Sequence, residues 1–434
     1  MSIPEAARAQ AAALLRFIDA SPSPWHAAGN LAARFAAAGF AVLDEGDAWQ
    51  LAPGGRYLVR RGASLIAFVG GRGSPAEHGL RLAGAHTDSP GLRVKPRPTH
   101  VADGMLRLAV EVYGGPILAT FADRDLSLAG RVMLRGQDGG APKECLVHFD
   151  KPIARLPNLA IHMNREVNEA GLKFHKQNEL PLILSVAPTE GDPGQVLHAM
   201  LAACLGVAAG EILSWDLAVC DTQPGACWGP DEEFLAASRL DNLASCDAIA
   251  VALEACGEPQ AGCVAAFFDH EEVGSESAAG AAGSFVADVL RRYSLALGAD
   301  EEGHRRMLAK SFMVSADMAH AWHPNFPAAY EPGHRVLVNA GPVIKHNANQ
   351  RYSTDADTAA RFMTLCAEAG VPCQQYAHRT DLGCGSTIGP VVAARLGVPS
   401  VDVGAPMWAM HSLRESAGVA DHAAMIAALG RHFG

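Results

Sequence analysis

Short apolar runs that end abruptly in polar residues recur along the chain. The clearest is CVAAFF over residues 263–268, which is followed by Asp269, His270, Glu271 and Glu272. An unbroken apolar run of this length is typical of a strand that is buried on both faces of a parallel sheet. In open α/β sheets, chemistry gathers just beyond the carboxyl ends of the strands. The pattern therefore predicts a buried strand with two adjacent glutamates at a candidate site.

Strand-like and helix-like segments alternate through residues 1–90 and again after residue 231. Such alternation predicts an α/β fold with a mostly parallel sheet covered by helices on both faces. Strands are expected within 57–69 and over 80–85, 263–268, 312–315, 373–377 and 400–403. Helices are expected over about 4–20, 25–40, 243–255, 278–293, 355–369 and 390–396.

Residues 91–230 have a different texture. Residues 105–113 alternate partly between apolar and polar side chains, and 126–134 favour a further strand. One helix is expected over 195–205, without a βαβ repeat. We interpret this segment as a β-rich domain inserted into a catalytic domain made of residues 1–90 and 231–434.

The amino-acid composition and net charge limit the kinds of molecule that the protein is expected to bind. Of the 434 residues, 49% are hydrophobic and 19% are charged, which is typical of a globular protein. A formal net charge of −11 argues against a nucleic-acid partner or an anionic membrane surface. No apolar stretch reaches the ~18 residues of a membrane span, and the N-terminus does not resemble a signal peptide. The ten cysteines form no C-x-x-C pair, so we expect free thiols and a cytoplasmic location.

Potential metal ligands stand at several predicted strand ends and at one helix start. Each alone has a simpler explanation, since a lone histidine or aspartate there is usually a turn residue or a helix cap. Together they would bring two imidazoles and four carboxylates to one rim of the sheet. These residues are His86, Asp241, Glu271, Glu272, Asp317 and His411.

This set of side chains suits two borderline divalent cations such as zinc, which bind nitrogen and carboxylate oxygen. Two such ions need a bridging carboxylate and leave positions open for water and substrate. Asp88, two residues after His86, is placed to accept the other N–H of that imidazole. The absence of cysteine from the set favours a catalytic site over a structural one.

Several motifs resemble those of the M18 family of metalloaminopeptidases, whose best-known members are aspartyl aminopeptidases. They are GAHTDSPGLRVKP, SRLDNL, FFDHEEVGS, SADMAHAWHPN, PVIKHNANQRYSTD, GSTIGP and MHSLRE, in an order that spans nearly the whole chain. The resemblance implies that Asp241 bridges two divalent metal ions, with zinc the first candidate. It implies an α/β peptidase domain interrupted by a β-rich oligomerisation domain. The implied metal ligands are His86, Asp241, Glu272, Asp317 and His411, with Glu271 as the general base.

The implied reaction removes the N-terminal residue of a peptide substrate, with a preference for Asp or Glu. The metals would lower the pKa of a bridging water and polarise the scissile carbonyl. Glu271 would then move the water's proton to the leaving amine. Lys345 is our candidate partner for an acidic substrate side chain. We expect His320 and His323 on the loop surface, and leave open whether His346, Arg351 and Arg414 line the pocket or are solvated.

The resemblance also implies a large symmetric homo-oligomer, up to a dodecamer, with dimer contacts through residues 91–230. A histidine of this segment, His162, would reach the metal site of a neighbouring subunit and stabilise the oxyanion. From the residues alone, a hydrogen-bonded interface histidine is the simpler interpretation.

The sequence alone leaves two other functions open. One is a different dinuclear hydrolase on the same scaffold, a carboxypeptidase or an N-acyl-amino-acid deacylase, which would need a cationic anchor for a substrate carboxylate. The other is a non-catalytic shell or cargo protein that keeps only the fold. The presence of Glu271 argues against the second.

Overall fold

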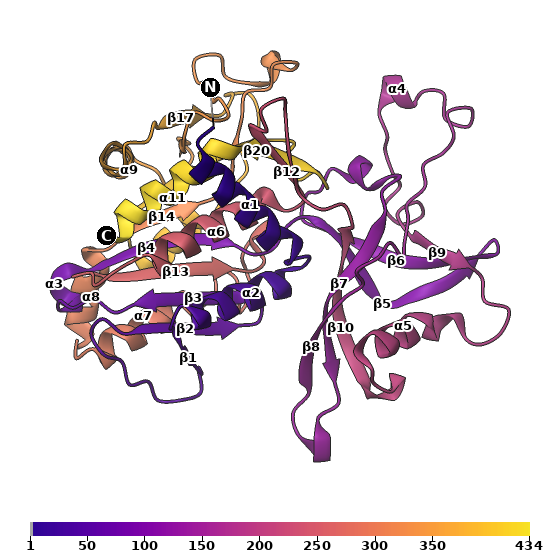
Figure 1. The fold of residues 1–434 in the computed structure, drawn as a ribbon, viewed down its shortest axis with the longest axis horizontal. Coiled ribbons are helices and arrows are strands. Elements are labelled where there is room, and N and C mark those ends of the chain that lie inside the picture. The colour runs from indigo at the N-terminus through magenta and orange to yellow at the C-terminus, as the bar shows by residue number, and fades with distance from the viewer. Residues whose placement is uncertain (1–2) are drawn as a thin grey trace.

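The computed structural model describes residues 3–434, which form two lobes that stand side by side (Figure 1). The larger lobe contains a nine-stranded sheet between layers of helices, and the smaller lobe contains a six-stranded sheet and one long helix. The predicted combination of an α/β fold and a β-rich part is confirmed. Within the described part of the chain, no helix is both long and apolar enough to cross a membrane.

The large sheet has the strand order β1-β2-β3-β13-β4-β14-β18-β16-β17. Its four central strands, β13, β4, β14 and β18, are parallel, so their carboxyl ends meet at one rim. In sheet order the strands are β1 (Ala41–Leu43), β2 (Arg56–Arg61), β3 (Ser64–Val69), β13 (Gly262–Phe268), β4 (Leu80–His86), β14 (Phe312–Ala316), β18 (Ser400–Gly404), β16 (Val343–His346) and β17 (Gln374–Ala377).

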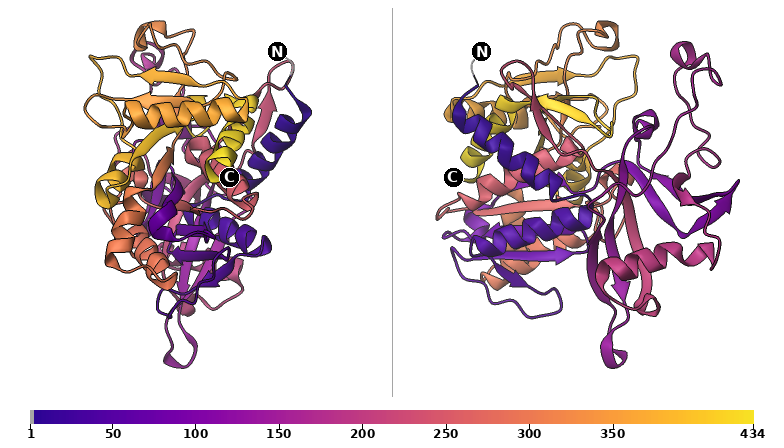
Figure 2. Two further views of the ribbon diagram at one scale, coloured as in Figure 1. Left: turned by 90° about the vertical axis from the view of Figure 1, so that its left-hand side faces the viewer. Right: turned by 45° about the vertical axis from the view of Figure 1, so that its right-hand side comes forward.

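Helices cover both faces of this sheet. In β13, Cys263, Ala265 and Phe267 belong to the apolar core on one face, while Val264 and Phe268 belong to the core on the other. The unbroken apolar run therefore has the two-sided burial that the sequence predicts. Figure 2 (right) shows α1 and α2 lying across one face of the sheet, and these helices share an apolar core with Cys263, Ala265 and Phe267. That face packs against α1 (Glu5–Asp19), α2 (Pro24–Ala37), α6 (Leu240–Glu254), α9 (Ala356–Ala369) and α11 (Val419–Phe433), and the other against α7 (Phe285–Ala296), α8 (Glu301–Ala309) and α10 (Ile388–Leu396).

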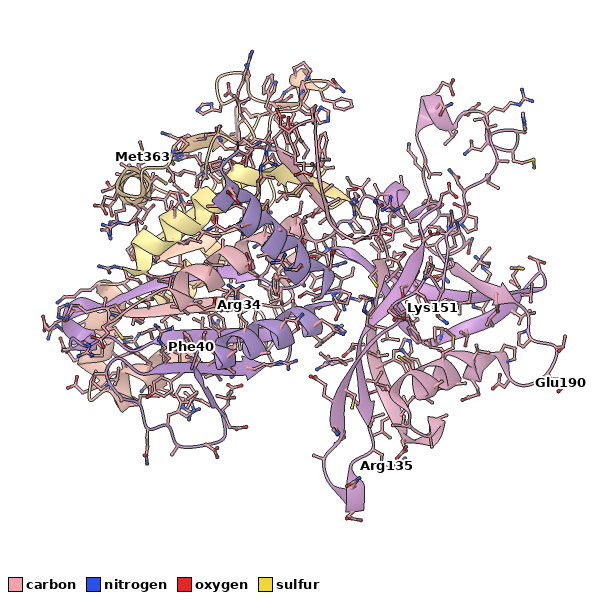
Figure 3. The ribbon with its side chains drawn as sticks, in the orientation of Figure 1. Arg34, Phe40, Arg135, Lys151, Glu190 and Met363 are labelled. Atoms are coloured by element: carbon pink, nitrogen blue, oxygen red, sulfur yellow. The ribbon has the colours of Figure 1, made fainter. Side chains whose placement is uncertain are left out.

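The smaller lobe is built on a sheet of order β8-β7-β10-β5-β6-β9. Arg135 marks the far tip of the hairpin between β7 and β8, and Glu190 marks the loop that leads to α5 (Figure 3). Its elements are β5 (Gly91–Ala102), β6 (Met105–Tyr113), β7 (Leu126–Leu134), β8 (Lys143–His148), α4 (Val167–Ala170), β9 (Leu182–Val186), α5 (Val196–Leu205) and β10 (Ile212–Asp221).

A third sheet has the order β11-β12-β20-β19-β15 and follows the smaller lobe in the chain. Strands β11 and β12 precede α6 in the sequence, whereas β15, β19 and β20 follow it. This sheet therefore brings the segment just after residue 225 together with later parts of the chain. The strands are β11 (Ala226–Trp228), β12 (Phe234–Ala237), β20 (Glu415–Gly418), β19 (Pro406–Trp408) and β15 (Ala319–His320).

The predicted helix over 278–293 is wrong in its first seven residues, because α7 begins only at Phe285. Residues 275–284 fold back on themselves instead. Ser275 has a φ of 64°, and a Cβ at Gly280 would lie 2.1 Å from the carbonyl oxygen of Ser275. The alanine and glycine composition of this stretch suits a tight loop as well as a helix, so the pattern alone does not separate them.

Candidate metal centre

The predicted ligands come together at the rim formed by the parallel strands. His86 is the last residue of β4, and Asp317 directly follows β14. Glu271 and Glu272 open a short 3-10 helix just beyond β13. The two remaining residues arrive from outside the large sheet: Asp241 at the start of α6 and His411 in the loop between β19 and β20.

Asp241 stands between the two histidines. Its Oδ1 lies 3.3 Å from Nε2 of His86, and its Oδ2 lies 3.5 Å from Nε2 of His411. A second carboxylate accompanies each histidine. Asp317 Oδ1 is 3.7 Å from the His86 nitrogen, and Glu272 Oε1 is 3.5 Å from the His411 nitrogen. Asp241 thus links the two histidines, and ligand atoms of His86, Asp241 and Glu272 all lie within 4.8 Å of one another.

These separations fit a shared cation better than hydrogen bonds. Good N–H···O hydrogen bonds have donor–acceptor distances of about 2.7–3.2 Å. Two ligand atoms bound to one tetrahedral zinc ion at about 2.0–2.2 Å lie about 3.4 Å apart. In addition, Asp241 Oδ1 is buried without a hydrogen-bond partner among the described residues. The side chains present therefore fit bound zinc better than a set of hydrogen bonds.

The charge balance of the cluster also favours bound cations. Asp241 and His86 are almost completely buried, with 3% and 1% of their surface exposed. Burial raises the pKa of Glu271 to about 8, and burial together with Asp241 raises the pKa of Glu272 well above its ordinary value. Carboxylates this crowded and this poorly solvated are stabilised as anions by bound cations.

Asp88 has a different set of partners from the one that the sequence predicts. The carbonyl oxygen of Asp88, not its carboxylate, is the nearer acceptor for Nδ1 of His86, at 3.0 Å against 3.5 Å. Its fully buried carboxylate instead accepts hydrogen bonds from the backbone N–H groups of Glu271 and Glu272, both at 3.1 Å. Asp88 therefore orients the turn that carries both glutamates, as well as the histidine.

Glu415 supports the other half of the centre. Its carboxylate accepts hydrogen bonds from the backbone N–H of His411 at 2.7 Å and from that of Asp241 at 3.1 Å. Burial raises the pKa of Glu415 to about 8. This residue has no signal in the sequence beyond its place in the MHSLRE motif, because its role depends on a turn that only the fold reveals.

A cavity of about 420 Å³ opens onto the centre. Lys345 lines it, as expected, with its Nζ 3.5 Å from Asp317 Oδ2 and its side chain almost fully buried. The prediction of a surface role is wrong for His320, which follows Asp317 by three residues and also lines the cavity. His346, Arg351 and Arg414 do not line it. The lining residues that the sequence analysis did not single out include Met318, Tyr352, Gly385, Ser386, Thr387 and Met410.

His162 lies apart from these residues. It is an exposed turn residue between β8 and α4, and it does not line the cavity of its own chain. Figure 1 shows α4 at the end of an extension that projects away from the larger lobe. Leu159 and Met163 on either side are 63% and 76% exposed. Any role of His162 in the chemistry would therefore have to be in another subunit.

Comparison with known proteins assigns the chain to a family. A family model described as aminopeptidase I zinc metalloprotease (M18) matches residues 17–433. The chain belongs to the M18 family. It is 48% identical over 425 residues to a probable M18 family aminopeptidase 2 of Stutzerimonas stutzeri (strain A1501), and the match covers 97% of each chain. It is thus an M18 aminopeptidase, a peptide hydrolase of a zinc metalloprotease family, and the resemblance in the motifs is confirmed.

Solved structures of M18 proteins have the same fold. A chain in the cryo-EM structure of the Ape4 and Nbr1 complex superposes with a TM-score of 0.95 at 37% identity, covering 100% of this chain and 87% of that chain. The structure of the S. cerevisiae mApe1 dodecamer gives a TM-score of 0.85 at 28% identity, covering 98% and 96%. The arrangement of an α/β lobe and a β-rich lobe is therefore shared within the family.

Proposed function

We propose that this M18 aminopeptidase is a dinuclear enzyme that removes acidic N-terminal residues from peptides. The position of Asp241 supports this most directly, because each of its two carboxylate oxygens lies beside a different histidine. One ion would be held by His86, Asp317 and Asp241. The other would be held by His411, Glu272 and the second oxygen of Asp241. Zinc is the first candidate, given the family and the nitrogen and oxygen donors.

Two cations bound there would supply Lewis acidity for a substrate carbonyl and lower the pKa of water. Glu271 is the remaining carboxylate, and its Oε2 is 4.0 Å from Nε2 of His86, farther than the oxygens of Asp241 and Asp317. It lines the cavity and is therefore placed to accept a proton from attacking water and deliver it to the leaving amine. Asp88 keeps Glu271 in that position through the hydrogen bond to its backbone.

Lys345 is our candidate for the recognition of an acidic side chain. A buried carboxylate needs a cationic partner, and Lys345 presents an ammonium group to the cavity. Its Nζ also donates a hydrogen bond to the carbonyl oxygen of Met318 at 3.2 Å, which fixes its position. The carboxylate of Asp317 already neutralises part of the positive charge of Lys345. A substrate carboxylate would therefore share the ammonium group of Lys345 with Asp317.

We further propose that the chain forms a large homo-oligomer, up to a dodecamer, through an inserted domain at residues 91–230. The structural similarity to the mApe1 dodecamer and the exposed apolar side chains around His162 support this. His162 would then reach a neighbour's cavity and donate to the developing oxyanion. The ten cysteines are all free in the structure, which supports a location in the reducing cytoplasm.

The trans role of His162 has a direct test by complementation. His162→Ala and Glu271→Gln variants would each be inactive or nearly so. Mixed after dissociation and reassembly, they should regain part of the activity, since some sites would combine an intact Glu271 with a partner's intact histidine. Unchanged activity of His162→Ala alone, or no recovery in confirmed mixed oligomers, would exclude the role.

The proposed function as a whole is tested by metal analysis and a substrate panel. The purified enzyme should contain two divalent ions per chain and cleave Asp-X and Glu-X peptides faster than Leu-X peptides. An N-acetylated peptide should not be cleaved, whereas a deacylase or carboxypeptidase would not require a free amine. One bound ion, or no preference for acidic residues, would remove the corresponding part of the proposal.

A further inference from the structure

A segment of the smaller lobe, residues 113–117, lies directly against the metal centre of its own chain. It begins with the last residue of β6 and runs past Glu272 and His411. A Cβ at Gly114 would lie 3.1 Å from Cβ of Glu272, and one at Gly115 would lie 3.7 Å from Nδ1 of His411. The left-handed φ of 66° at Gly114 also favours glycine. A side chain at Gly114 would therefore crowd Glu272, whereas a Cβ at Gly115 would be in ordinary van der Waals contact with His411.

Tyr113 connects this segment to the first half of the centre. Its hydroxyl donates a hydrogen bond to Asp88 Oδ2 at 2.7 Å. Asp88 Oδ2 also accepts from the N–H of Glu272, and Oδ1 accepts from the N–H of Glu271. Because the carboxylate of Asp88 is fully buried, each of these hydrogen bonds helps to stabilise its negative charge. Loss of the hydroxyl would leave a buried carboxylate one donor short beside His86.

The same segment contacts the second half of the centre through its backbone. The ring nitrogen Nδ1 of His411 lies 3.0 Å from the carbonyl oxygen of Gly115, which accepts a hydrogen bond from the Nδ1–H tautomer and leaves Nε2 free to bind a metal. Ile117 closes the contact, since its N–H donates to the carbonyl oxygen of His411 at 2.9 Å. Segment 113–117 therefore orients one histidine directly and the surroundings of the other through Asp88.

A stacked cation holds Tyr113 in place. The guanidinium of Arg93 on β5 lies 4.4 Å from the ring centre of Tyr113 and 4.8 Å from that of Trp25 on α2. Trp25 belongs to the larger lobe and is buried. The position of the tyrosine hydroxyl consequently depends on how the two lobes pack together at Arg93.

From these contacts we infer that Tyr113 is a positioning residue for the metal centre, and that segment 113–117 makes metal binding depend on the packing of the smaller lobe against the larger one. This inference rests on the proposed dinuclear site. Outer contacts of metal ligands typically contribute 10- to 100-fold in affinity or activity. We expect Tyr113→Phe, which keeps the ring and removes only the hydroxyl, to weaken zinc binding by about 10-fold or more.

The test measures zinc affinity of apoenzyme by competition with a chromophoric chelator, alongside peptidase rates at limiting and saturating zinc. Tyr113→Phe should bind zinc about 10-fold more weakly, and saturating zinc should restore most of its kcat. Arg93→Met, which removes the stacked cation and leaves the hydroxyl, should shift the affinity in the same direction. Unfolding curves of the zinc-free proteins report any general loss of stability.

Tyr293→Phe is the matched control. Its buried hydroxyl accepts a hydrogen bond from Gly71 N at 3.1 Å near the opposite end of β13, so its loss should leave zinc affinity within about twofold of wild type. If Tyr113→Phe matches this control while the wild type binds two zinc ions, the inference is wrong and the proposed function stands. A wild type that binds fewer than two ions removes the dinuclear part of the proposed function, and with it the basis of this inference.

Discussion

The two adjacent glutamates should respond in opposite ways to substitution. In Glu271→Gln the side chain keeps its size and its backbone hydrogen bond to Asp88, but it loses the ability to take a proton. In Glu272→Ala the centre loses the carboxylate that lies 3.5 Å from Nε2 of His411. The first change should therefore affect the rate and the second the metal content.

The expected size of the first effect follows from the role of Glu271. A positioned general base typically contributes about 10²–10⁴-fold to the rate, which corresponds to about 3–5 kcal/mol in activation free energy. Metal binding should change little, because oxygens of Asp241 and Asp317 lie closer to the His86 nitrogen than Glu271 does. KM should also stay within a few-fold, since the substrate's contacts do not depend on this proton transfer.

Two measurements on the same protein samples decide the assignment. Metal content after dialysis should be two ions per chain for wild type and Glu271→Gln, and about one for Glu272→Ala. Steady-state kinetics with an Asp-X peptide should show the loss in kcat for Glu271→Gln, with added zinc giving no recovery. Glu271→Asp serves as a control that retains a base at a longer distance and should keep more activity than the glutamine variant.

Either of two results would refute this reasoning. A Glu271→Gln enzyme with more than a tenth of wild-type kcat would mean that the proton is carried by another group. Loss of one ion from Glu271→Gln, with full metal content in Glu272→Ala, would mean that the two roles are exchanged.

Three further predictions follow from other parts of the structure. Chelation should abolish peptidase activity and zinc should restore it; activity that persists in protein shown to be metal-free would exclude metal catalysis. Lys345→Met should slow cleavage of Asp-X peptides at least ~10-fold more than that of Leu-X peptides; equal losses would exclude Lys345 as the selector. Burial lowers the pKa of His432 to about 4, below its unfolded value of about 6.5. The unfolded chain therefore binds the proton first, and the free energy of unfolding should fall between about pH 6.5 and 4. Urea unfolding at pH 7 and 5 should show a smaller fall for His432→Gln; an identical fall in both proteins would contradict this origin.

The strand ends were the most predictable part of this molecule. A buried strand such as β13 has to be apolar on both faces, so polar residues directly after it stand out in the sequence. Parallel neighbours then bring His86 and Asp317 to the same rim without any knowledge of loops. The position of Asp241 at the start of a helix was equally visible, although its place between two histidines was not.

The supporting contacts depend on loops whose paths carry no periodic signal. His320 lines the cavity because β15 pairs with β19 immediately after Asp317, a two-residue contact too short to predict. Glu415, at the start of β20, and Gly115, just after β6, contact residues that come from distant parts of the chain. Glutamates and glycines occur at many positions without such a role, so only the fold shows which of them contact a ligand.

The route of the chain through the large sheet has a consequence for how the protein folds. Strand β4 ends at His86, but its neighbour β13 begins only at Gly262, about 175 residues later. Closing a loop of that length in a disordered chain would cost about 5 kcal/mol in entropy. The smaller lobe shortens this distance, since Arg93 near its beginning pairs with Ala218 near its end. We therefore expect the smaller lobe to form first during synthesis and to bring β4 within reach of β13. A chain released before residue 262 would lack both neighbours of β4, β13 and β14, and would leave both edges of β4 open to aggregation with other strands.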